Sequence, residues 1–152
     1  MKDVIVRKAI PDDMDSILTL FKSLVTMEPD FEYHLRKHRA GFGAMMADSK
    51  RCRVLVAEMA GKVSGLCTAQ LLYSSAMGGF IALIENFVVA DAFRGQGLGQ
   101  QLLEILEQWA KKRGALRFDL QVDQNNAHAR SFYETNGWVE TNLASYFKYP
   151  SL

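Results

Sequence analysis

Cysteines and net charge are both scarce in this sequence, and each scarcity excludes a class of protein. The 152 residues hold two cysteines, Cys52 and Cys67, without the C-x-x-C spacing of metal or redox sites. We therefore expect no disulfide framework, no metal site and two thiols in the core. The formal net charge is +1 with both signs interspersed, which argues against a nucleic-acid partner because such a partner requires a strongly basic face.

Long apolar runs are also missing. None reaches the roughly 18 residues that a membrane-spanning helix needs, and no charged-then-apolar leader opens the chain. We therefore expect no membrane partner and a cytoplasmic location. Apolar residues make up 49% of the chain, which at this length predicts one domain, residues 1–152, with a core that needs no disulfides or metals.

Strand-like and helix-like segments are mixed along the chain, which predicts an α/β (α+β) fold. Strands are expected at 4–9, 53–59, 63–73, 80–89 and 116–122, with two closing strands at 138–139 and 146–149. Helices are expected at 11–27, from about 30 to 48, at 98–113, and after an asparagine cap at 125 or 126 through 135. Three sequential antiparallel strands precede the first glycine-rich turn, which excludes a Rossmann domain, where that turn follows the opening strand.

A glycine-rich turn joins the strand at 80–89 to the helix at 98. It comprises Arg94, Gly95, Gln96, Gly97, Leu98 and Gly99. Glycines let a backbone approach a ligand, and the first turn of a helix offers N–H groups and the positive end of the macrodipole, so this turn predicts a phosphate site. The alternative is a turn that merely starts a helix. Gln100 replaces the third glycine of a dinucleotide fingerprint, and no Walker Gly-Lys-Ser/Thr follows.

The spacing of Arg94, Gly97 and Gly99 after an Ile-Glu-Asn-Phe-Val-Val strand resembles the acyl-CoA pyrophosphate loop of the GNAT superfamily of N-acyltransferases. Downstream, the pattern that runs from Asn126 through Tyr133 to Trp138 is similar to the second signature of that family, at the usual separation. The resemblance implies a mixed, mostly antiparallel central sheet flanked by helices. It also implies acetyl-CoA as the co-substrate and a small-molecule primary amine as the acceptor.

Donor binding is assigned by this resemblance mainly to backbone groups. The turn from Gly95 to Gly99, with Arg94, would hold the pyrophosphate. In the family the preceding strand splays from its neighbour, and one of its N–H groups polarises the thioester carbonyl. Here that contact would come from Phe87 or Val88, and Val89 would pair with the pantetheine arm.

Glu85 is the one carboxylate in an otherwise apolar strand. It precedes Phe87 by two residues, so we expect it on the same face, placed to take a proton from an ammonium directly or through water. Burial in such a strand would make it a stronger base. The alternative is a carboxylate that pairs with Arg94 or another cation and organises the site. Asn86 would face the other way and is the weaker candidate.

Tyr133 occupies the general-acid position of the resembled family. A phenol, which ionises near pH ~10, suits protonation of a departing thiolate. The alternative is a core aromatic beside Phe132. In the same signature Asn126 would bind the pantetheine or cap its helix, and Ala129 is assigned to the cofactor with it. Direct transfer in a ternary complex is expected, because neither cysteine lies in the two signatures.

In the resembled family, the connection between the first two helices helps to form the acceptor site. Glu28, Asp30 and Glu32 could meet a cationic amine there, although acids near a helix start have a simpler explanation in the helix dipole. His34 and His38, four residues apart, fit a solvated basic face better than a metal site.

Two alternatives to a small-molecule acetyltransferase stay open at this stage. One is transfer to a protein or peptide, which needs an open groove. The other is a non-catalytic acyl-CoA-binding regulatory module, against which the presence of both Glu85 and Tyr133 speaks. The aromatic segment 146–149 and the frequency of dimers in the resembled family also predict a homodimer, which light scattering would exclude if it found only the monomer.

Overall fold

The computed structural model describes residues 3–151, which fall into two compact units. One unit ends at Leu120 and the other begins at Gln121. The first holds a β-sheet with its helices, and the second holds one helix and an irregular segment. Each unit is described by itself.

The first unit is built on a five-stranded sheet in the order β1-β2-β3-β4-β5. Its elements are β1 Val4–Lys8, η1 Pro11–Asp13, α1 Met14–Thr26, α2 Leu35–Ala47, β2 Cys52–Met59, β3 Lys62–Ser74, β4 Gly79–Val89, η2 Asp91–Phe93, α3 Leu98–Lys112 and β5 Ala115–Leu120. The first four strands pair antiparallel, and β4 pairs with β5 in parallel. The predicted mixed, mostly antiparallel sheet is confirmed, and α3 is the crossover between the parallel strands.

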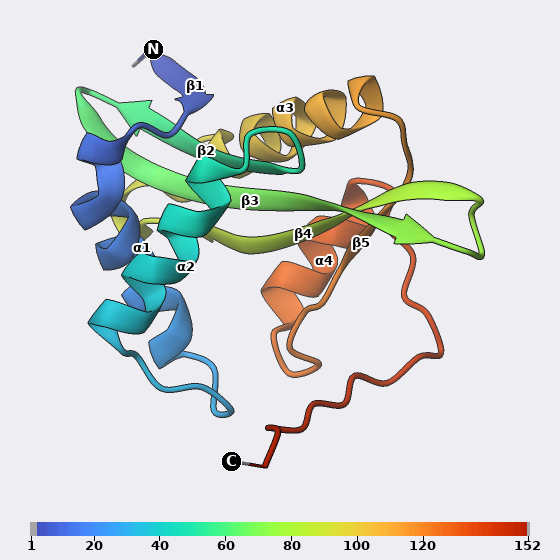
Figure 1. Cartoon of the computed structure of the whole chain (residues 1–152). Helices are drawn as coiled ribbons and strands as arrows, with labels where there is room; N and C mark the ends of the chain where they lie inside the picture. Colours follow the sequence, from blue (N-terminus) through green and yellow to red (C-terminus); the bar gives the residue numbers. More distant parts are fainter. Residues whose placement is uncertain (1–2, 152) are drawn as a thin grey trace. The chain divides into compact units, whose positions relative to one another are not determined.

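Helices cover both faces of this sheet. Figure 1 shows α1 and α2 on one side and α3 on the other. Buried side chains from the first two helices, such as Leu18 and Phe42, pack against Val56 and Leu66 of the sheet. The opposite face meets the apolar stripe of α3, which includes Leu102 and Leu106. Because successive strand residues alternate between the two faces, each side chain of a regular strand points either toward α1 and α2 or toward α3.

A buried carboxylate ties β1 to the start of α1. Asp13 accepts hydrogen bonds from the Ile10 N–H at 2.8 Å and from Arg7 Nη1 at 2.7 Å, and Arg7 also reaches Glu58 of β2 at 3.1 Å. The Arg7 guanidinium holds the pKa of the Asp13 carboxyl below its usual value, because the ionised form receives these bonds. This contact holds the start of α1 against β1 and β2.

Gly65 of β3 lies close to α3. A Cβ added there would lie 2.9 Å from Leu102 Cδ1 and 3.1 Å from Ala57 Cβ. Both distances are too short for ordinary packing, and Leu102 is fully buried. Glycine at this position therefore sets how closely α3 lies against β3, next to the end of β4 that leads into the glycine turn.

We expect Gly65→Val to destabilise the protein by about 1–3 kcal/mol, because the new side chain overpacks the contact with α3. Chemical denaturation monitored by circular dichroism measures this loss. As a control, Leu102→Ala should rescue part of it in the double variant, since the smaller side chain makes room for valine. Strict additivity of the two single losses would contradict the proposed contact.

Two predicted boundaries are wrong in the first unit. The second helix begins at Leu35 and not near 30, because His34 still has an extended backbone and its carbonyl accepts the first helical bond from the His38 N–H at 3.0 Å. The last strand ends at Leu120 and not at 122. Its predicted buried face is also incomplete, since Leu116 is 57% exposed at the edge of the sheet.

The second unit contains α4 Ala127–Thr135. Asn126 caps it through a 3.0 Å bond from the Ala129 N–H, and Gly137 follows it with a φ of 87°. The two predicted closing strands, 138–139 and 146–149, are wrong: residues 138–151 form no strand. Their apolar side chains are not buried, with Val139 86% and Tyr146 93% exposed, so nothing stabilises a pleated conformation there.

Candidate active site

The glycine turn forms as the sequence predicts and opens α3. Gly95 and Gly97 have φ values of 72° and 83°, in the region that favours glycine. Gly97 is the N-cap, and its carbonyl accepts the first helical bond from the Gln101 N–H at 3.1 Å. The N–H groups of the first turn of α3 therefore have no partner within the helix, as a phosphate site requires.

Arg94 lies at the start of this turn and is held by two contacts. Its Nε donates to the Val89 carbonyl at 3.1 Å, and its Nη2 pairs with Asp91 at 2.9 Å. The side chain is about half exposed. The predicted alternative in which Arg94 pairs with Glu85 is wrong, because Asp91 of η2 takes that place.

A β-bulge interrupts β4 just before the turn. Glu85 pairs with Thr68 and Val88 pairs with Leu66, so two residues of β4 face a single residue of β3. Asn86 accommodates the extra residue with a φ of 55° and donates from Nδ2 to Thr68 Oγ1 at 2.8 Å. Asparagine is among the side chains that tolerate this conformation best.

The bulge overturns one sequence prediction. Cross-strand partners lie on the same face, so Glu85 shares the α1 and α2 face with Val88, and not with Phe87 as the plain strand alternation predicted. Phe87 and Val89 lie on the α3 face. Asn86 does not face away from Glu85 either, because its amide reaches Thr68, the residue opposite Glu85.

The end of β4 has strand partners on one side only. Pairing with β5 ends at Ile84 and Leu120, whereas pairing with β3 continues to Val89. The Ala90 N–H donates to the Ser64 carbonyl at 2.8 Å, so by alternation the N–H and C=O of Val89 point away from β3. The contact of the Val89 carbonyl with Arg94 agrees with this direction. The N–H and C=O of Val89 thus point outward from the unpaired side of β4, which we call its free edge, beside the glycine turn.

Glu85 lies on the sheet face below α1 and α2. The prediction that it is buried is wrong, because the side chain is exposed. Its Oε1 accepts a long hydrogen bond from Gln70 Nε2 at 3.4 Å. The carboxylate is therefore accessible and has a polar neighbour, an arrangement that permits proton exchange with a substrate or water.

A cavity of about 600 Å³ lies next to this carboxylate, between α2 and the sheet. It is lined by Phe21, Lys37, His38, Gly41, Phe42, Ala44, Met45, Asp48, Cys52, Gln70 and Asn86. Sequence reasoning did not find Gln70 or Lys37. The only signal was that Gln70 is a polar residue in a strand whose neighbours are apolar, which marks a surface or a site.

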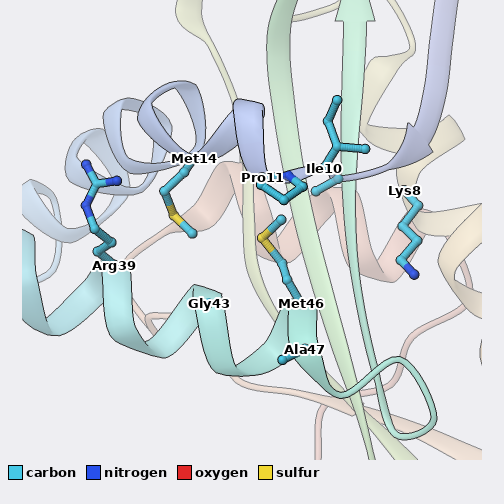
Figure 2. Close-up of a pocket in the computed structure, with 9 residues that line it drawn as sticks. Lys8, Ile10, Pro11, Met14, Arg39, Gly43, Met46 and Ala47 are labelled. Atoms are coloured by element: carbon cyan, nitrogen blue, oxygen red, sulfur yellow. The ribbon is translucent and has the colours of Figure 1, made fainter.

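A second cavity, of about 670 Å³, lies between the start of α1 and the far side of α2. Figure 2 shows the thioethers of Met14 and Met46 at its centre and the cations Arg39 and Lys8 toward its two ends. Its lining is mostly apolar and includes no carboxylate, histidine or tyrosine. It therefore lacks a proton acceptor suited to the chemistry of an amine.

Both cysteines are buried free thiols, as predicted. Burial raises the pKa of the Cys67 thiol, and burial together with the Asp48 charge raises the pKa of Cys52. Neither is activated as a nucleophile, since a reactive cysteine needs a lowered pKa. Within residues 3–151 no cluster of His, Cys, Asp and Glu side chains could hold a metal ion, and no helix is long and apolar enough to cross a membrane.

In the second unit, Tyr133 lies on α4 within an aromatic group. Its ring meets Phe132 at 5.4 Å and Trp138 at 6.0 Å, both edge to face, and it is half-buried. These contacts fix the ring, while the Asn126 cap fixes the start of the same helix. The segment thus holds Tyr133 in one orientation within its own unit.

The comparison with known families covers most of the chain. The sequence model of the acetyltransferase (GNAT) family matches residues 14–138. The chain belongs to this family. The predicted resemblance is confirmed, and the GNAT match covers both the turn and the segment around Tyr133.

Individual GNAT relatives resemble the chain over most of its length. An aminoalkylphosphonate N-acetyltransferase of Salmonella typhimurium is 28% identical over 137 residues, covering 90% of this chain and 86% of that protein. A putative acetyltransferase from Agrobacterium tumefaciens str. C58 has a TM-score of 0.80 at 25% identity, with 95% and 99% of the two chains covered.

An aminoglycoside N-acetyltransferase, AAC(6')-Iy, solved in complex with CoA, shows the same fold. Its TM-score is 0.83 at 17% identity, over 99% of this chain and 97% of that one. Family membership and the named relatives make the protein an acetyl-transferring enzyme of the GNAT type.

Proposed function

We propose that the protein transfers the acetyl group of acetyl-CoA to the primary amine of a small molecule, by direct attack within a ternary complex. The observation that carries the proposal is the free edge of β4. The N–H and C=O of Val89 face away from β3, on the side of β4 that β5 leaves unpaired, just before the glycine turn. A thioester arm can pair with such an edge while its pyrophosphate binds the N-terminus of α3.

Backbone groups supply most of the donor site in this proposal. The pyrophosphate accepts hydrogen bonds from the backbone N–H groups of the glycine turn, Gly95, Gln96, Gly97, Leu98 and Gly99, and Arg94 adds a positive charge. The N–H of Val89 pairs with the pantetheine. Of the two oxyanion candidates, Phe87 is favoured, since Val88 is paired with Leu66 and by alternation its N–H faces β3.

Proton transfer is assigned to two side chains. Glu85 accepts the proton of the attacking amine, directly or through a water held with Gln70, and Tyr133 donates a proton to the departing thiolate. Asn126 caps α4 with its carbonyl oxygen, which leaves its amide N–H groups for the pantetheine beside Ala129. No covalent acetyl-enzyme is needed in this scheme.

The same proposal treats residues 1–152 as one catalytic domain. The GNAT match runs from 14 to 138 and so spans both compact units, which supports this reading. A cytoplasmic location and a homodimer stay predictions. Exposed apolar side chains between 139 and 149 support the dimer, since free apolar surface of this kind often meets a partner.

The proposed function is tested by the release of free CoA from acetyl-CoA with a panel of acceptors. The panel contains aminoalkylphosphonates, amino acids, polyamines, aminosugars, aminoglycosides and peptides with a free N-terminus. We expect release that depends on a small-molecule amine. Release with peptides alone would replace the proposal by protein acetylation, and acetyl-CoA binding without release for any amine would favour a regulatory module.

We expect Glu85→Gln to remove the acidic limb of the pH profile of kcat/KM. A base must be ionised to act, and the amide of glutamine cannot accept the proton, so any part of the rise of kcat/KM with pH that depends on residue 85 should be lost. Steady-state kinetics with two acceptors of different amine pKa separates this limb from deprotonation of the amine itself. The matched control is Glu104→Gln, an exposed glutamate of α3 that contacts Gln100. A full acidic limb in Glu85→Gln would assign the base elsewhere.

A further inference from the structure

The cavity next to Glu85 is lined by a lysine and a histidine from the start of α2. Lys37 and His38 line it together with Gln70 and Asn86 of the sheet. Gln70 also contacts the Glu85 carboxylate at 3.4 Å. Lys37 and His38 therefore share one space of about 600 Å³ with Gln70, the neighbour of the proposed base, and this volume suits a small ligand.

Lys37 is exposed, and its charge has no acidic partner in residues 3–151. It makes no hydrogen bond or ion pair there, whereas Arg39, two residues on, pairs with Asp15 at 2.9 Å. The helix itself offers no compensation, because α2 contains Arg36, Lys37, His38 and Arg39 and no acidic residue.

The position of these cations conflicts with the helix dipole. Lys37 and His38 are the third and fourth residues of α2, at the end where the macrodipole is positive. Cations there destabilise a helix, and acids are the usual choice. A local conflict of this kind is expected at functional sites, and it disappears when an anion binds at this end of the cavity.

Neighbouring contacts orient the cationic end. The His38 ring meets Phe21 edge to face at 4.8 Å, and its Nε2 lies 3.3 Å from the Glu32 carbonyl. The carboxylate of Glu32 is 3.5 Å from His34 and not at Lys37. Of the three acids that the sequence suggested for an amine, Glu28, Asp30 and Glu32, none lines the cavity.

The acidic groups lie elsewhere along the cavity. Asp48 lines it beyond the far end of α2, about 15 Å along the helix from His38 at 1.5 Å per residue. Its Oδ1 accepts from the Arg51 N–H at 3.2 Å. The cavity thus has Lys37 and His38 near one end of α2 and Asp48 at the other.

We propose that the acceptor is an amine that also carries an anionic group, a phosphonate, phosphate or carboxylate, held by Lys37 and His38 while its amino group reaches Glu85. The inference rests on the proposed function and names its substrate class. A polyamine fits this arrangement poorly, because a second ammonium group would meet the uncompensated Lys37.

The test compares aminopropylphosphonate with aminopropanol and diaminopropane, which share the carbon chain and differ in the end group. We expect kcat/KM to be highest for the phosphonate. In Lys37→Glu the ratio of kcat/KM for phosphonate over alcohol should fall by about tenfold or more, since one charge-assisted contact is replaced by repulsion. Lys37→Arg should keep most of the ratio. Arg36→Glu, the same charge change on the adjacent residue outside the cavity lining, is the matched control and should leave the ratio unchanged.

Calorimetry with aminopropylphosphonate separates the inference from the proposed function. Binding that weakens in Lys37→Glu and not in Arg36→Glu supports the anion site, even if no amine is acetylated and the proposed function fails. Equal or better turnover of the alcohol or the diamine by the wild type overturns the inference and leaves the acetyltransferase proposal intact. An equal fall of the ratio in Arg36→Glu would also overturn it, because general surface charge would then explain the effect.

Discussion

Acetyl-CoA binding is expected to be lost when Gly97 is replaced by aspartate, with affinity reduced by at least about 100-fold. Gly97 caps α3 with a φ of 83°, and apart from its two chain neighbours no residue comes within 4 Å of an added Cβ. The open space is where we place the pyrophosphate. A carboxylate there would occupy the space and repel the ligand charge at the same time.

Isothermal calorimetry with acetyl-CoA measures this loss, and the structure offers a matched control. Gly61, in the turn between β2 and β3, has a φ of 74° and likewise nothing within 4 Å of an added Cβ. Gly61→Asp introduces the same charge and similar backbone strain at a site outside the glycine turn of residues 94–99. If both variants bind acetyl-CoA alike, the turn is not the donor site.

Turnover is expected to fall by about 10²-fold or more in Tyr133→Phe, with acetyl-CoA affinity nearly unchanged. The substitution removes one hydroxyl and keeps the ring, which packs against Phe132 and Trp138. If the phenol protonates the departing thiolate, only an interaction of the transition state is lost. The variant should therefore bind acetyl-CoA as the wild type does and turn over far more slowly.

Steady-state kinetics with the best acceptor, together with calorimetry, checks this separation. Tyr146→Phe is the control, because that tyrosine of the same unit is 93% exposed. Near-normal turnover in Tyr133→Phe would mean that water or another group protonates the thiolate. A parallel loss of affinity and turnover would instead point to a structural role for the hydroxyl.

The sequence predicts best those helices and turns whose first and last residues are marked by a local preference, such as a glycine or a capping side chain. α3 is bounded by Gly97 and by the cations before Gly114, and its apolar stripe matches the helical period. The cap at Asn126 is likewise local, since it depends on the preference of one asparagine side chain for the first position of a helix. These elements form as predicted.

The errors lie where long-range contacts decide the structure. The bulge at Asn86 places Glu85 and Phe87 on opposite faces, and it depends on a contact with Thr68 of the neighbouring strand. An asparagine within a strand was the only local signal. The predicted closing strands fail for a similar reason, because aromatic composition favours a strand only when a partner and a buried face are available.

The cavity itself could not be read from the sequence. Its lining comes from α1, α2 and three strands, which are brought together only by the register of the sheet and the packing of the helices. The basic run in α2 was predicted to be a solvated face. Arg36, Lys37 and Arg39 are indeed exposed, and the structure adds that Lys37 and His38 line the cavity next to Glu85.

Transfer of isotopically labelled acetyl from acetyl-CoA tests the central claim most directly, with the products analysed by mass spectrometry. Our account predicts one labelled acetyl group on the nitrogen of the small-molecule amine for each CoA released, and no label on the protein when the amine is omitted. Label retained on the protein before the amine is added would contradict direct transfer. CoA release without an acetylated amine would contradict the proposed function.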